Sequence, residues 1–528
     1  MEDDKKKRKK KKKRLLSPVV VVEPAKKRKR EEKVAPPPPS EAKDTEEEEE
    51  EEEATKTVVE GSGVSRLSVG DAVYRSGTLD SDVRARKVFA ALLEPVSVAD
   101  FYATYFEQRA LVLRGRSPKH VDGWISERDV WVALEAHELE HGVDVDVTRF
   151  EDGKRSNVGT GRCEASVARL EFETGASLRL RTPQERVRSV HALCEALEDE
   201  FGATVSANAY LTPPHAQGFA PHFDDVDAFV LQVEGDKRWK VFAPTTKDRA
   251  LPRVSSEDFG AIAEGYDLVF DGVLSRGDML YMPRGFAHEA RCSESRSLHL
   301  TVSTHRENCW ADFIERVLGT ALNRAAAEDP ALRASLPRDC FHLFGVQHRD
   351  DDDGETADDG DGDETADDDD LVAAVVIDPE LPRGQMERAK RRARFRATLA
   401  KLLDGVLARV DPDDAADDMA ARFVAERQPP SRSRKKVPIS ATTLLHPAGR
   451  RLARLVVDGD KALVYHACEN STAHRKQPVA CLEFDLDDGP AIERLLDAHP
   501  ARPVVVHSLP LPDLDDRHGF WPTASGHV

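Results

Sequence analysis

The chain has 528 residues, and 77 Lys and Arg against 97 Asp and Glu give it a formal net charge of −20. This length is too great for one compact domain and predicts two to four. The seven cysteines form no C-x-x-C pair, which favours a reducing intracellular compartment over a disulfide-stapled secreted domain. No apolar run is long enough to cross a bilayer, so we expect no membrane partner.

Residues 1–65 are predicted to form a disordered tail. Two basic clusters, KKKRKKKKKR and KKRKR, precede an acidic run at residues 46–53. Blocks of like charge repel themselves and cannot bury apolar area. The basic clusters are either a solvated tail or an address for the nucleus and nucleolus that also contacts RNA phosphates, and we favour the address. The acidic run suits basic partners such as ribosomal proteins or histones.

Residues 66–306 are predicted to form an antiparallel barrel or sandwich preceded by helices. A short strand is expected at ALVLRG, and a strand at ASLRLRT precedes the helix PQERVRSVHALCEALEDEFG, which Gly202 ends. Further short strands follow at SANAYLT, DAFVLQVEG, RWKVFAP, DLVFDGVLSRGDMLYMP and SLHLTVST. Close spacing of short strands with Gly and Pro turns is typical of such all-β folds.

Residues 307–430 are predicted to be helical, with an acidic disordered insertion at 350–370. Two stretches carry apolar residues at helical spacing, namely Phe313, Ile314, Val317, Leu318 and Ala321, and then Leu399, Leu402, Leu403, Val406 and Val410. Amphipathic helices beside a barrel need a surface that covers their apolar face. That surface is either the barrel or a second subunit.

Residues 431–528 begin within a linker, ERQPPSRSRKKVP, and are predicted to form a small α+β module of usual domain size. Strands are expected at RLARLVVDGDKALVYHA and ACLEFDLD, and a helix at GPAIERLLDAHP. This helix carries Glu493 and Asp497 and few basic residues. Because a helix that reads nucleic acid should be basic, the pattern disfavours direct DNA binding by this module.

Polar residues stand at the mouth of an apolar sheet in APHFDDVDAFVLQVEGDKRWKVFAP, residues 220–244. Residues two apart in a strand share a face, so His222 and Asp224 are predicted to project to one side. His288, in MLYMPRGFAHEA, is the candidate third ligand from a distant strand. Two imidazoles and one carboxylate on one octahedral face match the facial triad of non-haem Fe(II) oxygenases. An isolated H-x-D pair is more often a surface feature, and the strand context is what favours a metal site.

Lys237 has the strand parity of Trp239 and Val241, which places it toward the interior. A buried ammonium needs a counter-charge such as the far carboxylate of a dicarboxylate ligand. The alternative is a lysine that snorkels from a strand end. Polar residues also alternate on two strands expected to line the same cavity, namely Asn208, Tyr210, His299, Thr301 and Ser303. Asn208 or Tyr210 taken singly is as readily a structural polar group.

Three stretches closely resemble the JmjC-type ribosomal oxygenases, a family of Fe(II)- and 2-oxoglutarate-dependent enzymes. They are NAYLTPPHAQGFAPHFDDVDAFVLQVEGDKRW, GDMLYMPRGFAHEA and SLHLTVSTHRENCWADF. The likeness is greatest to the nucleolar branch, described as bifunctional lysine-specific demethylases and histidyl-hydroxylases. The resemblance implies an α+β fold with a double-stranded β-helix (cupin/JmjC) barrel, a helical dimerisation domain and a C-terminal winged-helix-like domain, hence a homodimer.

The resemblance also implies roles for individual residues. His222, Asp224 and His288 match the iron ligands of the family, and Lys237 matches the lysine that pairs with the C5 carboxylate of 2-oxoglutarate. The further co-substrate contacts of the family fall on Asn208, Tyr210 and Ser303. Dioxygen is the second co-substrate of such enzymes.

The implied activity is hydroxylation of a histidine in a large-subunit ribosomal protein in the nucleolus. The first alternative is demethylation of histone lysines, which is the same chemistry on an N-methyl carbon. Both substrates are basic, so charge does not separate them. Two other classes are a non-catalytic JmjC scaffold, which the complete ligand set disfavours, and a metal-binding isomerase without 2-oxoglutarate, which an interior Lys237 disfavours.

Overall fold

The structure is a computed structural model that describes residues 58–60, 81–262, 264–304, 307–346, 383–431, 439–447, 449, 451–473 and 480–511. Residues 1–57 and 61–65 of the predicted tail, the acidic insertion at 350–370 and residues 432–438 of the linker lie outside the described residues. The predicted disorder is wrong for Val58–Glu60, which form a short strand paired with residues 112–114. Residues 54–528 belong to one unit. None of the helices within the described ranges is long and apolar enough to span a bilayer.

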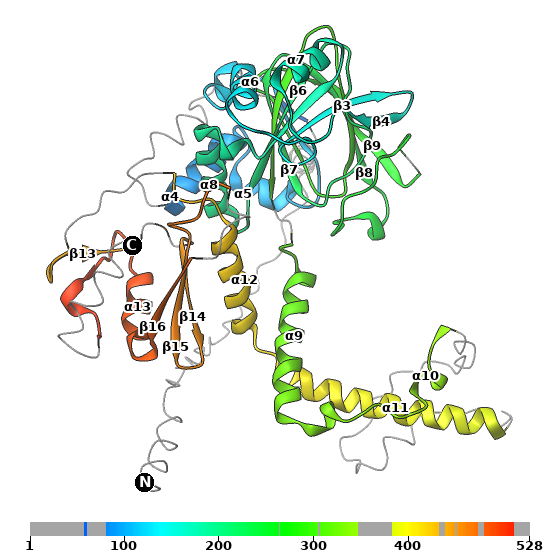
Figure 1. Ribbon diagram of the computed structural model, residues 1–528, viewed down its shortest axis with the longest axis vertical. Coiled ribbons are helices and arrows are strands. Elements are labelled where there is room, and N and C mark those ends of the chain that lie inside the picture. The colour runs from blue at the N-terminus through cyan, green and yellow to red at the C-terminus, as the bar shows by residue number, and fades with distance from the viewer. Residues whose placement is uncertain are drawn as a thin grey trace, which may run out of the picture. The chain divides into compact units, whose positions relative to one another are not determined.

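Two largely antiparallel sheets build the barrel (Figure 1). The larger sheet has the strand order β1-β2-β10-β7-β12-β6-β5-β3-β4, and the smaller has the order β11-β8-β9. The larger sheet consists of β1 (Val58–Glu60), β2 (Leu111–Arg114), β3 (Val145–Glu151), β4 (Lys154–Asn157), β5 (Ser177–Arg181), β6 (Ser206–Thr212), β7 (Asp227–Glu234), β10 (Met279–Met282) and β12 (Ser297–Thr304). The smaller consists of β8 (Lys237–Pro244), β9 (Tyr266–Leu274) and β11 (Ala287–Cys292). The predicted antiparallel barrel is confirmed.

Helices cover the outer face of the larger sheet. They are α4 (Ser81–Leu93), α5 (Val98–Asp100), the π-helical turn η2 (Phe101–Tyr105), α6 (Glu127–Ala136), α7 (Ala165–Glu173) and α8 (Arg188–Phe201). Phe89 of α4 packs on Phe101 with ring centroids 5.4 Å apart, and both contact Phe229 of β7. Gly202 ends α8 in the left-handed conformation at φ 66°, as predicted. The predicted start of this helix was wrong, because residues 183–185 form a separate 3₁₀ turn led by Pro183.

The side chains of β12 divide between two environments. Leu298, Leu300 and Val302 are buried in the core under the helices. His299 and Thr301 point the other way, into the space between the two sheets. This alternation follows the predicted one, because successive strand residues face opposite sides of a sheet.

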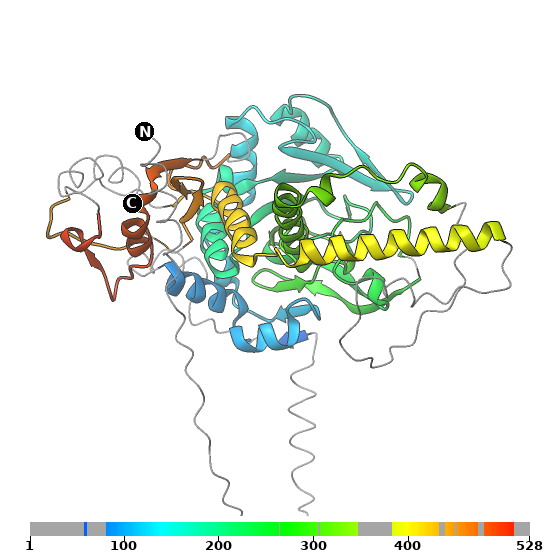
Figure 2. The ribbon, with the colours of Figure 1, turned by 90° about the horizontal axis from the view of Figure 1, so that it is seen from below.

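The helical region contains α9 (Trp310–Glu328), α10 (Cys340–Leu343), α11 (Arg383–Leu407) and α12 (Pro412–Glu426), and Figure 2 shows the length of α11. Ala321 and Ala325 of α9 are buried against Val406 of α11. Val317 is also buried, but five members of the predicted faces stay exposed, namely Ile314, Leu318, Leu399, Leu403 and Val410. Two neighbouring leucines, Leu322 and Leu407, are exposed as well. Neither the barrel nor the neighbouring helix covers these side chains.

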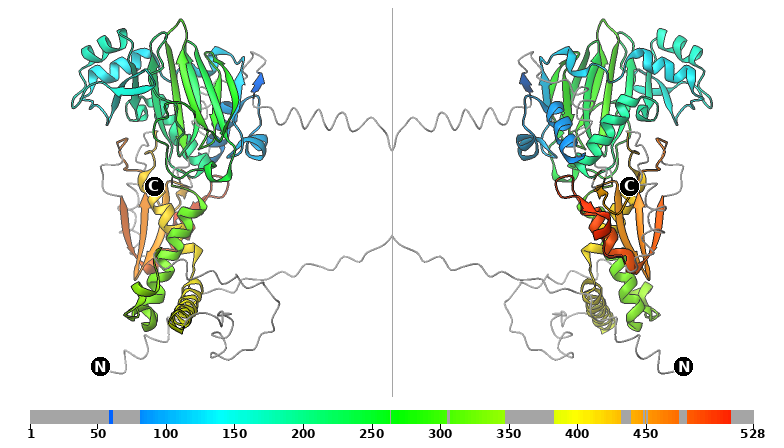
Figure 3. Two further views of the ribbon diagram at one scale, coloured as in Figure 1. Left: turned by 90° about the vertical axis from the view of Figure 1, so that its right-hand side faces the viewer. Right: turned by 90° about the vertical axis from the view of Figure 1, so that its left-hand side faces the viewer.

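The C-terminal module is a three-stranded antiparallel sheet with a helix against it (Figure 3). The sheet consists of β14 (Ala453–Asp458), β15 (Lys461–His466) and β16 (Cys481–Asp485), and the helix is α13 (Gly489–Leu496). Ile492 packs on Ala462 and Val464 in a small core. A second, two-stranded sheet pairs β13 (Leu444–Leu445) with β17 (Val504–Val505). The strands and helix predicted from the sequence are present.

Buried charges join the end of α12 to α8. The Arg427 side chain is fully buried, and its Nη2 lies 2.9 Å from Asp199 Oδ1. Arg427 Nη1 donates to the carbonyl of Arg451, 2.7 Å away. The amide of Gln428 donates to Glu198 Oε2 at 2.9 Å. These contacts attach the segment that leads to the C-terminal module to a helix of the barrel domain.

We expect Arg427→Met to lower the free energy of unfolding by about 3–5 kcal/mol, since it leaves buried carboxylates without their cation. Urea titration followed by circular dichroism measures the change. Arg422→Met is the matched control, because Arg422 pairs with Glu426 at the surface and should cost less than about 1 kcal/mol. Equal losses of unfolding free energy in the two variants would contradict a stabilising role for the buried Arg427 contacts.

Candidate metal and co-substrate site

A single backbone bridge closes the barrel at its open end. His222 donates its amide to the carbonyl of His288 at 3.2 Å, and His288 donates to the carbonyl of His222 at 2.8 Å. The backbone carbonyl of Asp224 accepts a hydrogen bond from the amide of Gly285 at 3.0 Å. Residues 221–226 are not a strand, because β7 begins only at Asp227. The predicted strand at His222 was therefore wrong, and the bridge rather than strand parity brings the three side chains together.

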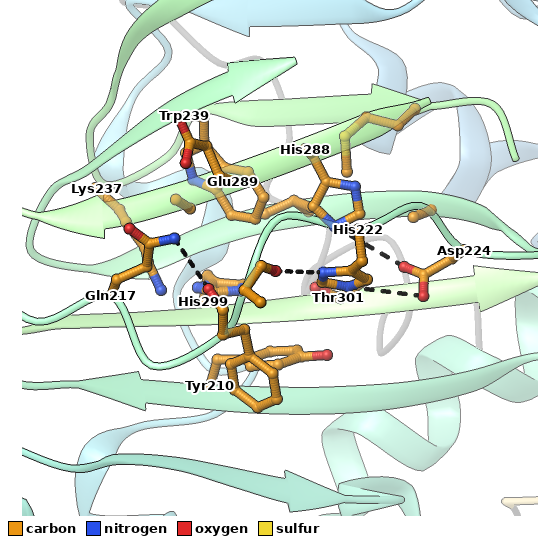
Figure 4. A pocket seen from close by; sticks show the side chains of 16 residues that line it. Tyr210, Gln217, His222, Asp224, Lys237, Trp239, His288, Glu289, His299 and Thr301 are labelled. Carbon is orange, nitrogen blue, oxygen red and sulfur yellow. Dashed lines mark hydrogen bonds and ion pairs between the residues drawn. The ribbon is translucent and has the colours of Figure 1, made fainter. Parts of the chain in front are cut away.

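His222, Asp224 and His288 converge on one point, with candidate ligand atoms all within 4.8 Å of one another (Figure 4). Nε2 of His222 lies 3.8 Å from Asp224 Oδ1, and Nε2 of His288 lies 3.9 Å from Asp224 Oδ2. The other ring nitrogens face carbonyls, with His222 Nδ1 2.8 Å from the oxygen of Ala220 and His288 Nδ1 3.1 Å from that of Phe286. A proton on each Nδ1 leaves the Nε2 lone pairs directed at the shared point.

The protonation state of this cluster suits a divalent metal. Burial, together with the nearby His222, lowers the pKa of His288 to about 4. His288 is therefore neutral at pH 7 and binds a cation without first losing a proton. Two imidazole nitrogens and one carboxylate are the donor set of non-haem Fe(II) centres, so these residues fit ferrous iron.

A buried cation lies across the cavity from the metal ligands. Lys237 is 3% exposed, and its Nζ donates to Thr212 Oγ1 at 3.0 Å. Burial lowers the pKa of Lys237 to about 8. Within the described part of the chain no carboxylate pairs with this ammonium. The site therefore favours an anionic ligand that reaches Lys237 from the metal.

Aromatic rings form the floor between Lys237 and the histidines. Tyr210 stacks on His299 with ring centroids 4.7 Å apart and planes 9° apart. Trp239 meets His299 edge-on at 5.2 Å. His299 Nδ1 and Trp239 Nε1 are buried and make no hydrogen bond to any described residue. Buried polar atoms of this kind normally have partners, so the cavity is built for a ligand with polar groups.

The structure brings five of the seven predicted site residues to one cavity, namely Tyr210, His222, Asp224, Lys237 and His288. Asn208 and Ser303 lie farther along β6 and β12 and do not line the described cavity. The role of each of the seven stays a prediction. Sequence reasoning missed Thr212, although it shares the strand parity of Asn208 and Tyr210 and could have been found by extending that alternation.

Comparison with known proteins gives matches over most of the chain. The JmjC domain family matches residues 179–312, and the family described as ribosomal oxygenase 1, C-terminal winged helix domain, matches residues 422–520. Ribosomal oxygenase 1 of Rattus norvegicus is 32% identical over 465 residues, which cover 84% of the chain and 72% of that relative. The bifunctional lysine-specific demethylase and histidyl-hydroxylase NO66 of Dictyostelium discoideum is 32% identical over 455 residues, with 83% and 81% covered.

Solved structures of one bacterial protein also match. The Escherichia coli ribosomal oxygenase YcfD is 18% identical with a TM-score of 0.38, covering 82% of this chain and 96% of that chain. A second structure of YcfD, in complex with cobalt and 2-oxoglutarate, is 16% identical with a TM-score of 0.36, covering 82% and 98%.

Proposed function

Since the chain belongs to the ribosomal oxygenase family of JmjC-domain, 2-oxoglutarate-dependent oxygenases, we propose that it hydroxylates a histidine side chain of a large-subunit ribosomal protein. One observation supports this most directly: the cluster of His222, Asp224 and His288 shares a cavity with the buried ammonium of Lys237. A metal site alone would serve many reactions. The lysine opposite it matches a co-substrate that carries a second carboxylate.

Each side chain has a defined task in this reaction. His222, Asp224 and His288 would hold Fe(II), and Lys237 would bind the far carboxylate of 2-oxoglutarate through a charge-assisted hydrogen bond. Thr212 orients the Lys237 ammonium. Bound Fe(II) with 2-oxoglutarate and dioxygen supplies the oxidation of a substrate C–H bond, while the co-substrate becomes succinate and carbon dioxide. The protein positions the reactants and limits the access of water.

Incubation with large-subunit ribosomal proteins, Fe(II) and 2-oxoglutarate tests the proposal. Peptide mapping by mass spectrometry is expected to show a gain of one oxygen on a histidine. The second candidate is histone lysine demethylation, which the name of the Dictyostelium discoideum relative favours. Loss of a methylene from a methylated histone peptide would support that candidate. A protein that turns over neither substrate class and does not consume 2-oxoglutarate would be a scaffold, and the proposal would fall.

We also propose that the protein acts in the nucleus and nucleolus. The basic clusters at residues 5–14 and 26–30 support this, because such clusters serve as import signals and also contact RNA phosphates. Both clusters lie outside the described residues. Microscopy of the full chain beside a chain that lacks residues 1–33 tests the location.

The open apolar faces of α9 and α11 support a homodimer. Six exposed apolar side chains on the two helices, together with Val410 just after α11, are between 38 and 56% exposed, and the six follow helical spacing. Contiguous apolar surface of this kind usually marks a protein interface. We propose a second copy of the chain as the partner, because the two helices present the same kind of surface and symmetric self-association covers both at once.

We expect Leu403→Glu to weaken this self-association by about 100-fold, since it would place a carboxylate in an apolar interface. Size-exclusion chromatography with light scattering reports the mass. Leu268→Glu is the control, because Leu268 on β9 is 54% exposed, close to the 51% of Leu403, and belongs to neither helix. A single-chain mass for the unaltered protein, or a two-chain mass that survives Leu403→Glu, would rule out this interface.

A further inference from the structure

The two parts of the metal site lie on separate segments. Asp224 belongs to the irregular segment before β7, whereas His288 lies on β11 after the turn that contains Arg284. Beside the ligands, Gly285 links these segments through its amide, which donates to the carbonyl of Asp224. Together with the reciprocal amide bonds between His222 and His288, this bond joins the backbones of the two segments, but it contacts neither the carboxylate of Asp224 nor the imidazole of His288.

A buried polar network spans the same two segments. Arg284 Nη1 donates to Asp227 Oδ2 at 2.8 Å and to Glu107 Oε1 at 2.5 Å. The hydroxyl of Tyr281 donates to Asp227 Oδ1 at 2.8 Å. The side chains of Asp227 and Arg284 are 0% and 8% exposed. We call Glu107, Asp227, Tyr281 and Arg284 the Arg284 clamp.

The backbone around the Arg284 clamp is also constrained. Glu107 adopts φ 56°, a left-handed conformation that non-glycine residues rarely take. Its amide donates to the Tyr281 hydroxyl at 3.0 Å. A residue keeps such a conformation only where its surroundings determine it. The Arg284 clamp therefore holds its members in one arrangement. Asp227 lies three residues after Asp224 in the chain, and Arg284 lies four residues before His288.

We propose that Arg284 and Asp227 are positioning residues, which fix the segment of Asp224 against the turn before His288 and so preorganise the metal site. Neither residue touches the metal or a substrate. The inference rests on the proposed function only for the identity of the metal. Ligands that are held in place before binding lose less freedom when the metal arrives, so loosening the Arg284 clamp should weaken metal binding itself.

Titration of the full chain with Co²⁺ tests this role in metal binding without any turnover. The visible absorption bands of the bound Co²⁺ report its affinity. Arg284→Met is expected to weaken Co²⁺ binding by about 10- to 100-fold, the usual effect of removing a group that orients metal ligands. Arg284→Lys should restore part of the affinity, because one ammonium still reaches Asp227. Arg84→Met is the matched control, since Arg84 pairs with Glu195 at 3.0 Å and is equally buried but lies on α4.

The control should lose stability yet bind Co²⁺ within about 2-fold of the unaltered protein, because its charge pair orients no metal ligand. Asp227→Asn keeps the size of the side chain and should fold even where Arg284→Met does not, with a similar loss of Co²⁺ affinity. Unchanged Co²⁺ binding in folded Arg284→Met or Asp227→Asn would overturn the proposal, as would an equal loss in Arg84→Met. Failure of histidine hydroxylation would leave these titrations, and hence this proposal, intact.

Discussion

Replacing Asp224 by Ala is expected to lower 2-oxoglutarate turnover by more than about 1,000-fold. The carboxylate is the one anionic ligand of the cluster, and it lies within 3.9 Å of both imidazole Nε2 atoms. Without it, two neutral imidazoles hold a doubly charged ion, and metal affinity should fall together with activity. Succinate release measures turnover, and Co²⁺ titration measures metal binding in the same preparations.

Asp225→Ala is the matched control for this substitution. Asp225 is the adjacent aspartate, but its carboxylate accepts from Ser255 Oγ at 2.6 Å instead of facing the histidines. Its removal should leave metal affinity close to that of the unaltered protein. Full turnover in Asp224→Ala would contradict the metal site, and so would equal losses in both variants.

Lys237→Met is expected to weaken 2-oxoglutarate binding by about 100-fold while Co²⁺ binding stays unchanged. The variant removes the cation that the far carboxylate would meet, and it leaves the three metal ligands in place. Isothermal titration of the Co²⁺-loaded protein separates the two effects. Lys240→Met is the control, since Lys240 on the same strand pairs with Glu289 at 3.0 Å. Undiminished 2-oxoglutarate affinity in Lys237→Met would show that Lys237 does not bind the far carboxylate.

The lowered pKa of Lys237 adds a pH dependence to this binding. With the cavity empty, the ammonium of Lys237 loses its proton as pH rises through about 8. Above that value, binding of a carboxylate must take up a proton, so 2-oxoglutarate affinity should fall about tenfold per pH unit. Below pH 8 the lysine is already charged, and the affinity should depend little on this group. Lys237→Met should lack the decline.

Strand parity predicted much of the cavity. The alternation in β12 placed His299 and Thr301 between the sheets, and the parity of Lys237 with Trp239 placed the ammonium inside. These predictions succeed because the period of two is a local property of an extended chain. The same rule, applied one strand earlier to His222, failed because that residue stands in an isolated bridge to His288. A bridge between distant residues leaves no periodic signal in the sequence.

The helical region shows a second limit of sequence reasoning. The apolar spacing of α9 and α11 predicted which side chains need cover, but Val406 packs on the neighbouring helix while Leu403, three residues earlier, stays half exposed. The apolar periodicity of a helix predicts which side chains share a face, but it does not predict which surface packs against that face. The 3₁₀ turn before α8 was missed for a similar reason, since a proline that can begin an α-helix also suits such a turn.

The reciprocal amide bonds between His222 and His288 serve two purposes at once, because they fasten the two halves of the barrel and bring both imidazoles together. A molecule in which these two segments part would lose the backbone bridge and the pairing of the two imidazoles together. Loss of bound Co²⁺ on partial unfolding is therefore expected to coincide with the parting of this backbone bridge.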